Sequence, residues 1–123
     1  MRLYGLRGAV CAENTAEDIT KNVGSMCEEL FKRNGLNPTD IVSIQFTMTG
    51  DLTALNPAAA LRKAHIDFDV TKCALFCSSE PPVANALPRC IRVLVTAYMA
   101  DNSPIHHVYQ NGAEVLRPDF VEK

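Results

Sequence analysis

The sequence predicts an α+β fold in which one mixed β-sheet is covered by helices on one face. Three observations support this prediction. Residues 89–98 alternate in the way that is typical of a half-buried strand. Residues 15–35 carry apolar side chains at helical spacing between a cap and a glycine. The order of segments is strand, long helix, strand, short helix, strand, strand and hairpin, which favours helices packed on a single sheet.

The first predicted strand, residues 3–10, carries a charge in its middle. Arg7 falls on the same face as Leu3, Gly5 and Ala9 because side chains alternate along a strand. Two glycines flank this arginine, which indicates a close backbone approach or a bulge near a site.

The long helix is bounded by recognisable end signals. Thr15 and Asp18 have the spacing of a capping box, and Asn34-Gly35 supplies a C-terminal stop. Between them runs one apolar stripe, formed by Ile19, Val23, Met26, Cys27, Leu30 and Phe31. This stripe predicts the face that packs on the sheet.

The middle of the chain predicts two strands and a short helix. Residues 42–48 form a strand in which Val42, Ile44, Phe46 and Met48 alternate with polar residues. Residues 72–77 form a short strand before a polar loop at 78–82. Between them, Asn56-Pro57 is typical of a capped helix start with proline at the first position, and the helix continues to Ala64.

The C-terminal part predicts a β-hairpin. Residues 107–110 and 114–116 flank Asn111-Gly112, which is a strong two-residue hairpin signal.

Length and composition limit the possible functions. The 123 residues predict one domain, residues 1–123, with an ordinary hydrophobic fraction. A net charge of −2 gives no electrostatic footprint for nucleic acid or an anionic membrane. No apolar run reaches the length of a membrane span and no signal peptide opens the chain, so we expect a cytoplasmic protein.

Cysteines and histidines do not indicate a disulfide framework or a metal site. The cysteines number five, an odd count without a CxxC motif, so we expect reduced thiols. His65, His106 and His107 have no partners at metal-ligand spacing, so no metal is expected.

Arg92 is the most informative residue of the chain. Ile91 and Val93 face inward on the 89–98 strand, which leaves Arg92 on the other face among apolar neighbours. A guanidinium in mid-strand is costly to bury without an anionic partner. The pattern leaves two partners open, a protein carboxylate such as Glu80 or an anionic ligand.

Other polar residues extend this set, while the motifs of nucleophilic, nucleotide-binding and zinc-dependent enzymes are absent from the sequence. Arg7, Arg62, Arg117, Tyr109 and Cys77 suit an anionic small molecule, because guanidinium groups bind carboxylates bidentately. Each residue alone also has a structural interpretation, such as a solvated helix face for Arg62 or a cross-strand packing aromatic for Tyr109.

Taken in order, six short motifs resemble the monofunctional AroH class of chorismate mutases over roughly residues 2–120. They are Gly5-Leu6-Arg7-Gly8-Ala9, Asp51-Leu52-Thr53-Ala54, Pro57-Ala58 with Arg62, Cys90-Ile91-Arg92-Val93, His107-Val108-Tyr109, and Val115-Leu116-Arg117-Pro118-Asp119. Glu80 lies at the spacing before Arg92 that this family shows.

The resemblance implies a homotrimer that forms a pseudo-α/β-barrel, with sites between subunits. It also implies the Claisen rearrangement of chorismate to prephenate in phenylalanine and tyrosine biosynthesis, which needs no nucleophile, metal or cofactor. The protein would hold the dianion in its reactive shape and stabilise developing charge.

The resemblance assigns a role to each matching residue. Arg92 corresponds to the donor to the ether oxygen, Arg7 and Tyr109 to contacts of a substrate carboxylate, and Glu80 to the acceptor of the ring hydroxyl. The remaining substrate-binding positions are a pocket wall at Cys77 and Phe76, residues from the adjacent subunit at Ala58 and Arg62, and the closing segment Leu116-Arg117.

Three positions depart from the family pattern. Asn56 replaces an aromatic residue, Ala59 replaces a charged one, and Phe76 replaces a small polar one. We expect these changes to alter substrate affinity more than the chemical step. Two alternative functions remain at this point, an enamine/imine deaminase of the RidA type and a non-catalytic AroH-like protein that binds another carboxylate.

Overall fold

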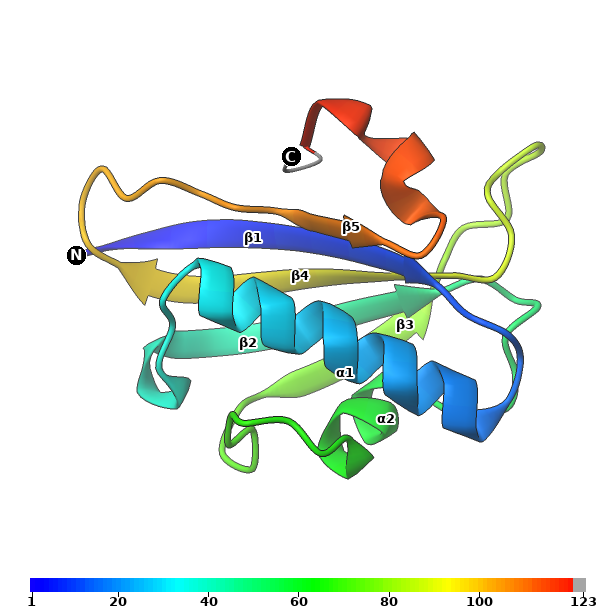
Figure 1. The fold of residues 1–123 in the computed structure, drawn as a ribbon, viewed down its shortest axis with the longest axis horizontal. Helices are drawn as coiled ribbons and strands as arrows, with labels where there is room; N and C mark the ends of the chain where they lie inside the picture. The colour runs from blue at the N-terminus through cyan, green and yellow to red at the C-terminus, as the bar shows by residue number, and fades with distance from the viewer. Residues whose placement is uncertain (121–123) are drawn as a thin grey trace.

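The computed structural model describes residues 1–120, which fold into one sheet and two α-helices (Figure 1). The strands are β1 Arg2–Cys11, β2 Ile41–Met48, β3 Leu75–Ser79, β4 Cys90–Met99 and β5 Val108–Gln110. The α-helices are α1 Ala16–Arg33 and α2 Pro57–Lys63, and the 3₁₀ turns are η1 Pro38–Asp40, η2 Ala113–Leu116 and η3 Pro118–Phe120.

The sheet is mixed, with strand order β3-β2-β4-β1-β5. Strand β4 runs antiparallel to both β1 and β2, while the outer pairs β2–β3 and β1–β5 are parallel. Parallel neighbouring strands need a crossover connection, and the connection between β2 and β3 contains α2. The strand that carries Arg92 is therefore central.

Both α-helices lie on one face of the sheet, as the sequence predicted (Figure 1). The apolar stripe of α1 is fully buried against the inward side chains of the central strands. On β4 these inward residues are Ile91, Val93, Val95 and Ala97, which confirms the predicted alternation. The α+β fold class with a mixed sheet is thus confirmed.

Glycine allows the close packing between β1 and its neighbours that the sequence indicated. A Cβ added at Gly8 would lie 3.0 Å from Val93 Cγ1 and 3.1 Å from the carbonyl oxygen of Val108. Both strands that flank β1 therefore approach it closely beside Arg7, and a side chain at position 8 would separate them.

The ends of α1 follow the predicted signals with one difference. The amide of Asp18 donates to Thr15 Oγ1 over 3.1 Å, but the Asp18 carboxylate accepts from Glu13 N rather than from Thr15 N. Asn34 is the C-cap and Gly35 follows with φ +60°. The reciprocal half of the capping box thus reaches two residues further back along the chain.

Asn34 also connects α1 to the segment that leads into β5. Its side-chain amide donates to the carbonyl oxygen of His106 over 2.8 Å and accepts from the His106 amide over 2.9 Å. This buried side chain therefore has its hydrogen bonds satisfied and fixes the approach of β5 to the sheet.

The predicted C-terminal hairpin is wrong. Asn111 and Gly112 have positive φ values of 51° and 98°, as such a turn requires, but β5 pairs in parallel with β1. The residues after the turn form η2 instead of a strand. Local turn geometry was therefore predicted, whereas the strand partner was not.

Two smaller predictions also need correction. The third strand begins at Leu75, not at residue 72, and extends to Ser79. Val42 faces outward and is 46% exposed, because a bulge between Ile41 and Ser43 shifts the register with β4. The predicted alternation holds from Ile44 onward.

The second face of the sheet has little cover. Exposed apolar side chains on this open face include Leu3, Phe76, Leu94 and Tyr98, with exposed fractions of 39% to 65%. The η2 turn and Leu87 of the loop before β4 pack there, around a small cluster that contains Ala9, Cys90 and Ala113. No helix within residues 1–120 combines the length and hydrophobicity needed to cross a membrane.

Candidate active site

Arg92 and Glu80 form an ion pair on the open face of the sheet. Arg92 Nε lies 2.8 Å from Glu80 Oε1, and the side chain of Glu80 is only 16% exposed whereas that of Arg92 is 50% exposed. Glu80 follows β3, and its amide donates to the carbonyl oxygen of Met48 over 3.0 Å. The carboxylate is therefore held in place while the guanidinium extends toward solvent.

A cavity of about 240 Å³ borders this pair. Its polar lining consists of Thr49, Glu80 and Arg92, and Cys90 also lines it. The remaining wall is apolar and is formed by Pro81, Val83, Ala86 and Leu87. A small anionic ligand with an apolar ring would find both kinds of surface here.

Strand register aligns other predicted residues with Arg92. Arg92 lies opposite Ala9 on β1, and Ala9 lies beside Tyr109 on β5. Arg7 is two residues from Ala9 on the same face, opposite Leu94. Ala9 itself is 1% exposed and packs with Cys90 and Ala113, so η2 covers β1 at the point where Arg92 and Tyr109 flank it.

Phe120, which was not predicted as a site residue, lies among the cationic residues at this edge. The guanidinium carbon of Arg117 is 3.7 Å from the ring centroid of Phe120, and that of Arg7 is 5.2 Å away. The ring of Tyr109 is 6.1 Å from the same centroid. An aromatic ring attracts cations over its face, so Phe120 gathers both arginines near Tyr109.

Two further contacts order this cluster. Arg117 binds Asp119 through two hydrogen bonds of 3.0 Å and 2.7 Å, and the bonds lower the pKa of the Asp119 carboxyl. His107 Nδ1 accepts from the amide of Arg7 over 2.9 Å. Burial, followed by the nearby charges of Arg7 and Arg117, lowers the pKa of His107 below 6.5, so its ring is neutral at pH 7.

The structure separates the other predicted residues from Arg92 within one chain. Cys77 lies opposite the buried Phe46 and packs on the main core, so it faces the helices. Ala58 is 7% exposed in that core, and Arg62 is exposed on α2. These three side chains lie on the helix-covered side, whereas Arg92 points to the other side.

Leu116 and Phe76 do share the open face with Arg92, though in different places. Leu116 is half-buried against the small cluster of Ala9, Cys90 and Ala113. Phe76 is 65% exposed on the edge strand β3, in register with Gln45 of β2. One chain therefore brings Leu116 close to the Arg92 strand and leaves Phe76 at the rim.

A carboxylate aligns the beginning of the Arg92 strand. Asp51 accepts from the amide of Arg89 over 3.0 Å and from Thr49 Oγ1 over 2.6 Å. Thr49 Oγ1 accepts in turn from the amide of Cys90 over 3.0 Å. Arg89 has φ +50°, an unfavourable value for a residue with a side chain, so these bonds offset local strain.

We predict that Asp51→Asn lowers stability at neutral pH and that this difference shrinks in acid. The hydrogen bond from Thr49 is the main reason that the pKa of Asp51 lies below its usual 3.8. A lowered pKa adds stability above pH 3.8 that is lost as the carboxyl protonates. Urea unfolding of the unmodified protein and of Asp51→Asn, between neutral pH and pH 3, measures the difference in stability. A stability difference that does not change with pH would contradict this role of the Asp51 carboxylate.

Comparison with known proteins identifies the family. Residues 3–120 match the family model described as chorismate mutase type I. The chain is 33% identical over 122 residues to chorismate mutase AroH of Bacillus subtilis, covering 98% of this chain and 94% of that protein. It is 34% identical over 121 residues to chorismate mutase AroH of Thermus thermophilus, covering 94% of each.

A solved structure agrees with this result. A chorismate mutase from Clostridium thermocellum superimposes with a TM-score of 0.83 and 39% identity, covering 91% of this chain and 98% of that one. These matches span nearly the whole chain and favour this family over the deaminase alternative. The chain therefore belongs to the type I chorismate mutase family, whose activity is the conversion of chorismate to prephenate.

Proposed function

We propose that the chain catalyses this rearrangement by restraining chorismate and by stabilising its breaking ether bond through Arg92. The observation that carries the proposal is the Arg92–Glu80 ion pair at the cavity wall, with an Nε–Oε1 distance of 2.8 Å. A guanidinium has five N–H donors, so a bond through Nε leaves others for a ligand. A donor fixed where negative charge develops accelerates such a step most.

The second half of the proposal concerns the substrate carboxylates. Arg7 and Tyr109 lie on the same face as Arg92, and we assign them to one carboxylate of the dianion. Leu116-Arg117 would close over the bound substrate, with Glu80 accepting from the ring hydroxyl. Charge complementarity and restraint of a flexible molecule are then supplied by residues whose positions the sheet fixes.

We further propose that the site is completed by a second subunit in a homotrimer with a pseudo-α/β-barrel arrangement. Ala58 and Arg62 lie away from Arg92 in their own chain, and we assign them to the site of a neighbouring chain. The open sheet face supports association because its exposed apolar side chains would be covered. Sedimentation equilibrium should then give about three times the 13.5 kDa chain mass.

The decisive experiment follows the loss of chorismate absorbance with purified protein. We expect catalysis that saturates with substrate and that survives prior dialysis against a chelator, since no metal or cofactor enters the proposal. Asn56 and Ala59 predict a raised KM rather than a lowered kcat. A rate equal to the uncatalysed background would refute the proposal and favour a non-catalytic binder. We also propose that residues 1–123 form one domain and that the protein is cytoplasmic.

A further inference from the structure

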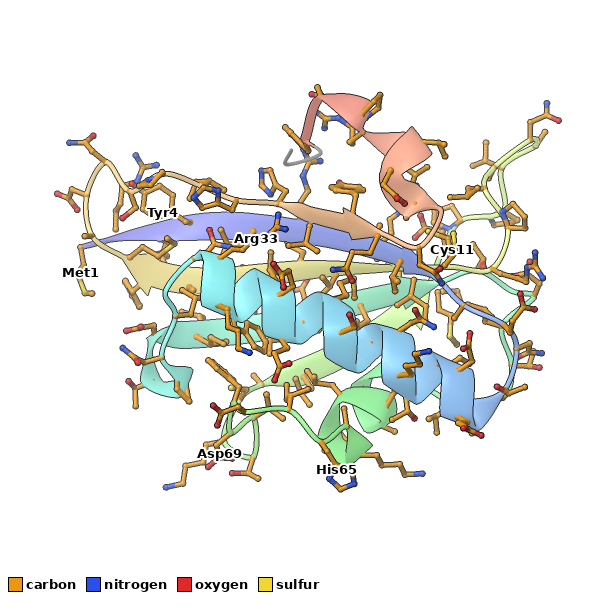
Figure 2. The ribbon with its side chains drawn as sticks, in the orientation of Figure 1. Met1, Tyr4, Cys11, Arg33, His65 and Asp69 are labelled. Carbon is orange, nitrogen blue, oxygen red and sulfur yellow. The ribbon has the colours of Figure 1, made fainter. Side chains whose placement is uncertain are left out.

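Two cysteines face each other at the end of the Arg92 strand. Cys11 is the last residue of β1 and pairs with Cys90, the first residue of β4 (Figure 2 labels Cys11). The next pair along the ladder, Ala12 and Arg89, is hydrogen-bonded, because the Ala12 amide donates to the carbonyl oxygen of Arg89. Hydrogen-bonded and non-hydrogen-bonded pairs alternate along an antiparallel ladder, so Cys11 and Cys90 form a non-hydrogen-bonded pair. Cα atoms of such pairs lie about 4.5 Å apart, within the roughly 4.4–6.8 Å that a disulfide spans.

The two side chains lie on the same face and interact. Both belong to the small cluster beneath η2, with Ala9 and Ala113. Burial raises the pKa of the Cys11 thiol, and a side-chain hydrogen bond with Cys90 opposes part of that effect. Burial, followed by the charge of Cys11, raises the pKa of Cys90 to about 12. Both cysteines are free thiols in this structure.

The pair lies between two cavities. Cys11 lines a cavity of about 470 Å³ together with Arg89, and Cys90 lines the 240 Å³ cavity that Arg92 and Glu80 border. A reagent can therefore reach Cys11 from one side. The same arrangement places Cys90 in the wall of the candidate active site.

The other cysteines lack this arrangement. Cys27 is fully buried on α1, and Cys73 precedes β3 while Cys77 faces the main core from that strand. Within the described residues, Cys11 and Cys90 are the one pair of cysteines that lie opposite each other on neighbouring strands.

We propose that Cys11 and Cys90 form a modification site, a dithiol that a small-molecule disulfide oxidises to an intramolecular disulfide. The Cys11 thiolate attacks one sulfur of the reagent and displaces its first thiol, which leaves a mixed disulfide. The Cys90 thiolate then attacks the Cys11 sulfur and displaces the second thiol. Two protein thiols and one reagent disulfide become one protein disulfide and two reagent thiols, so two electrons pass to the reagent.

Mass spectrometry tests this directly and does not depend on the proposed function. Reduced, folded protein is incubated with glutathione disulfide, quenched in acid, denatured and alkylated with iodoacetamide. We expect an intact mass lower by two hydrogens before alkylation, alkylation of three of the five cysteines, and a peptide that links Cys11 to Cys90. Dithiothreitol should restore alkylation of all five.

Two variants provide matched controls. Cys73→Ser should still form the link, because Cys73 lies outside the pair, whereas Cys11→Ser should form none. The wild-type result stands even if a variant does not fold. Full alkylation of all five wild-type cysteines, a stable glutathione adduct on Cys11 without transfer, or a link through another cysteine would overturn the proposal.

Discussion

Replacing Arg92 with alanine is expected to lower kcat by about 10²–10³-fold, which is typical of the loss of one preorganised donor to a developing oxyanion. The fold should persist, because the Arg92 side chain is 50% exposed and lies outside the buried core. Following chorismate loss under saturating substrate measures kcat, and thermal unfolding of the same preparation checks that the variant is folded.

Two further variants make this result specific. Arg92→Lys keeps a positive charge but loses the planar fork, so we expect only partial recovery. Arg33→Ala is the matched control, because Arg33 lies on α1, where Figure 2 labels it, and is also ion-paired. Its partner is Glu29. The kcat of Arg33→Ala should equal that of the unmodified protein. A full rate in Arg92→Ala would remove Arg92 from the mechanism while leaving the activity of the chain in place.

The sequence predicted most of the fold because its main signals are periodic. The alternation along β4 and the stripe of α1 each report burial over many residues, and one misplaced residue does not change them. The bulge at Val42 and the late start of β3 changed only local details. In contrast, the partner of β5 depends on contacts between segments far apart in sequence, and Asn111-Gly112 specifies only the turn itself.

The candidate site was predictable where a charge had to be explained. The position of Arg92 between apolar neighbours required an anion, and Glu80 now lies at 2.8 Å. Phe120 carried no such signal, since an aromatic residue near a chain end is common and its contact with Arg117 forms only in the folded protein. The face of the sheet on which the Cys77 side chain lies was also not predictable, because it depends on the register that pairs Cys77 of β3 with Phe46 of β2.

Removal of the Glu80 carboxylate is expected to produce the second largest loss of activity. Glu80→Ala deletes the group that orients Arg92, and a small misplacement of a catalytic group can cost about 10²-fold in rate. Under the proposed function it also deletes the acceptor for the ring hydroxyl, so KM should rise as well. Glu80→Gln keeps the size and one acceptor oxygen, and we expect it to retain more activity than the alanine variant.

The double variant Glu80→Ala/Arg92→Ala tests whether the two residues act as a unit. If Glu80 works mainly by holding Arg92, the double variant should be only slightly slower than Arg92→Ala alone, because groups that act together are strongly non-additive. The matched control is the Glu29–Arg33 ion pair on α1. Glu29→Ala, Arg33→Ala and the double variant of these two residues should all keep full activity. If the fold-losses in rate of the two single variants multiply in the double variant, the Glu80 carboxylate acts on the substrate directly and not by positioning the Arg92 guanidinium.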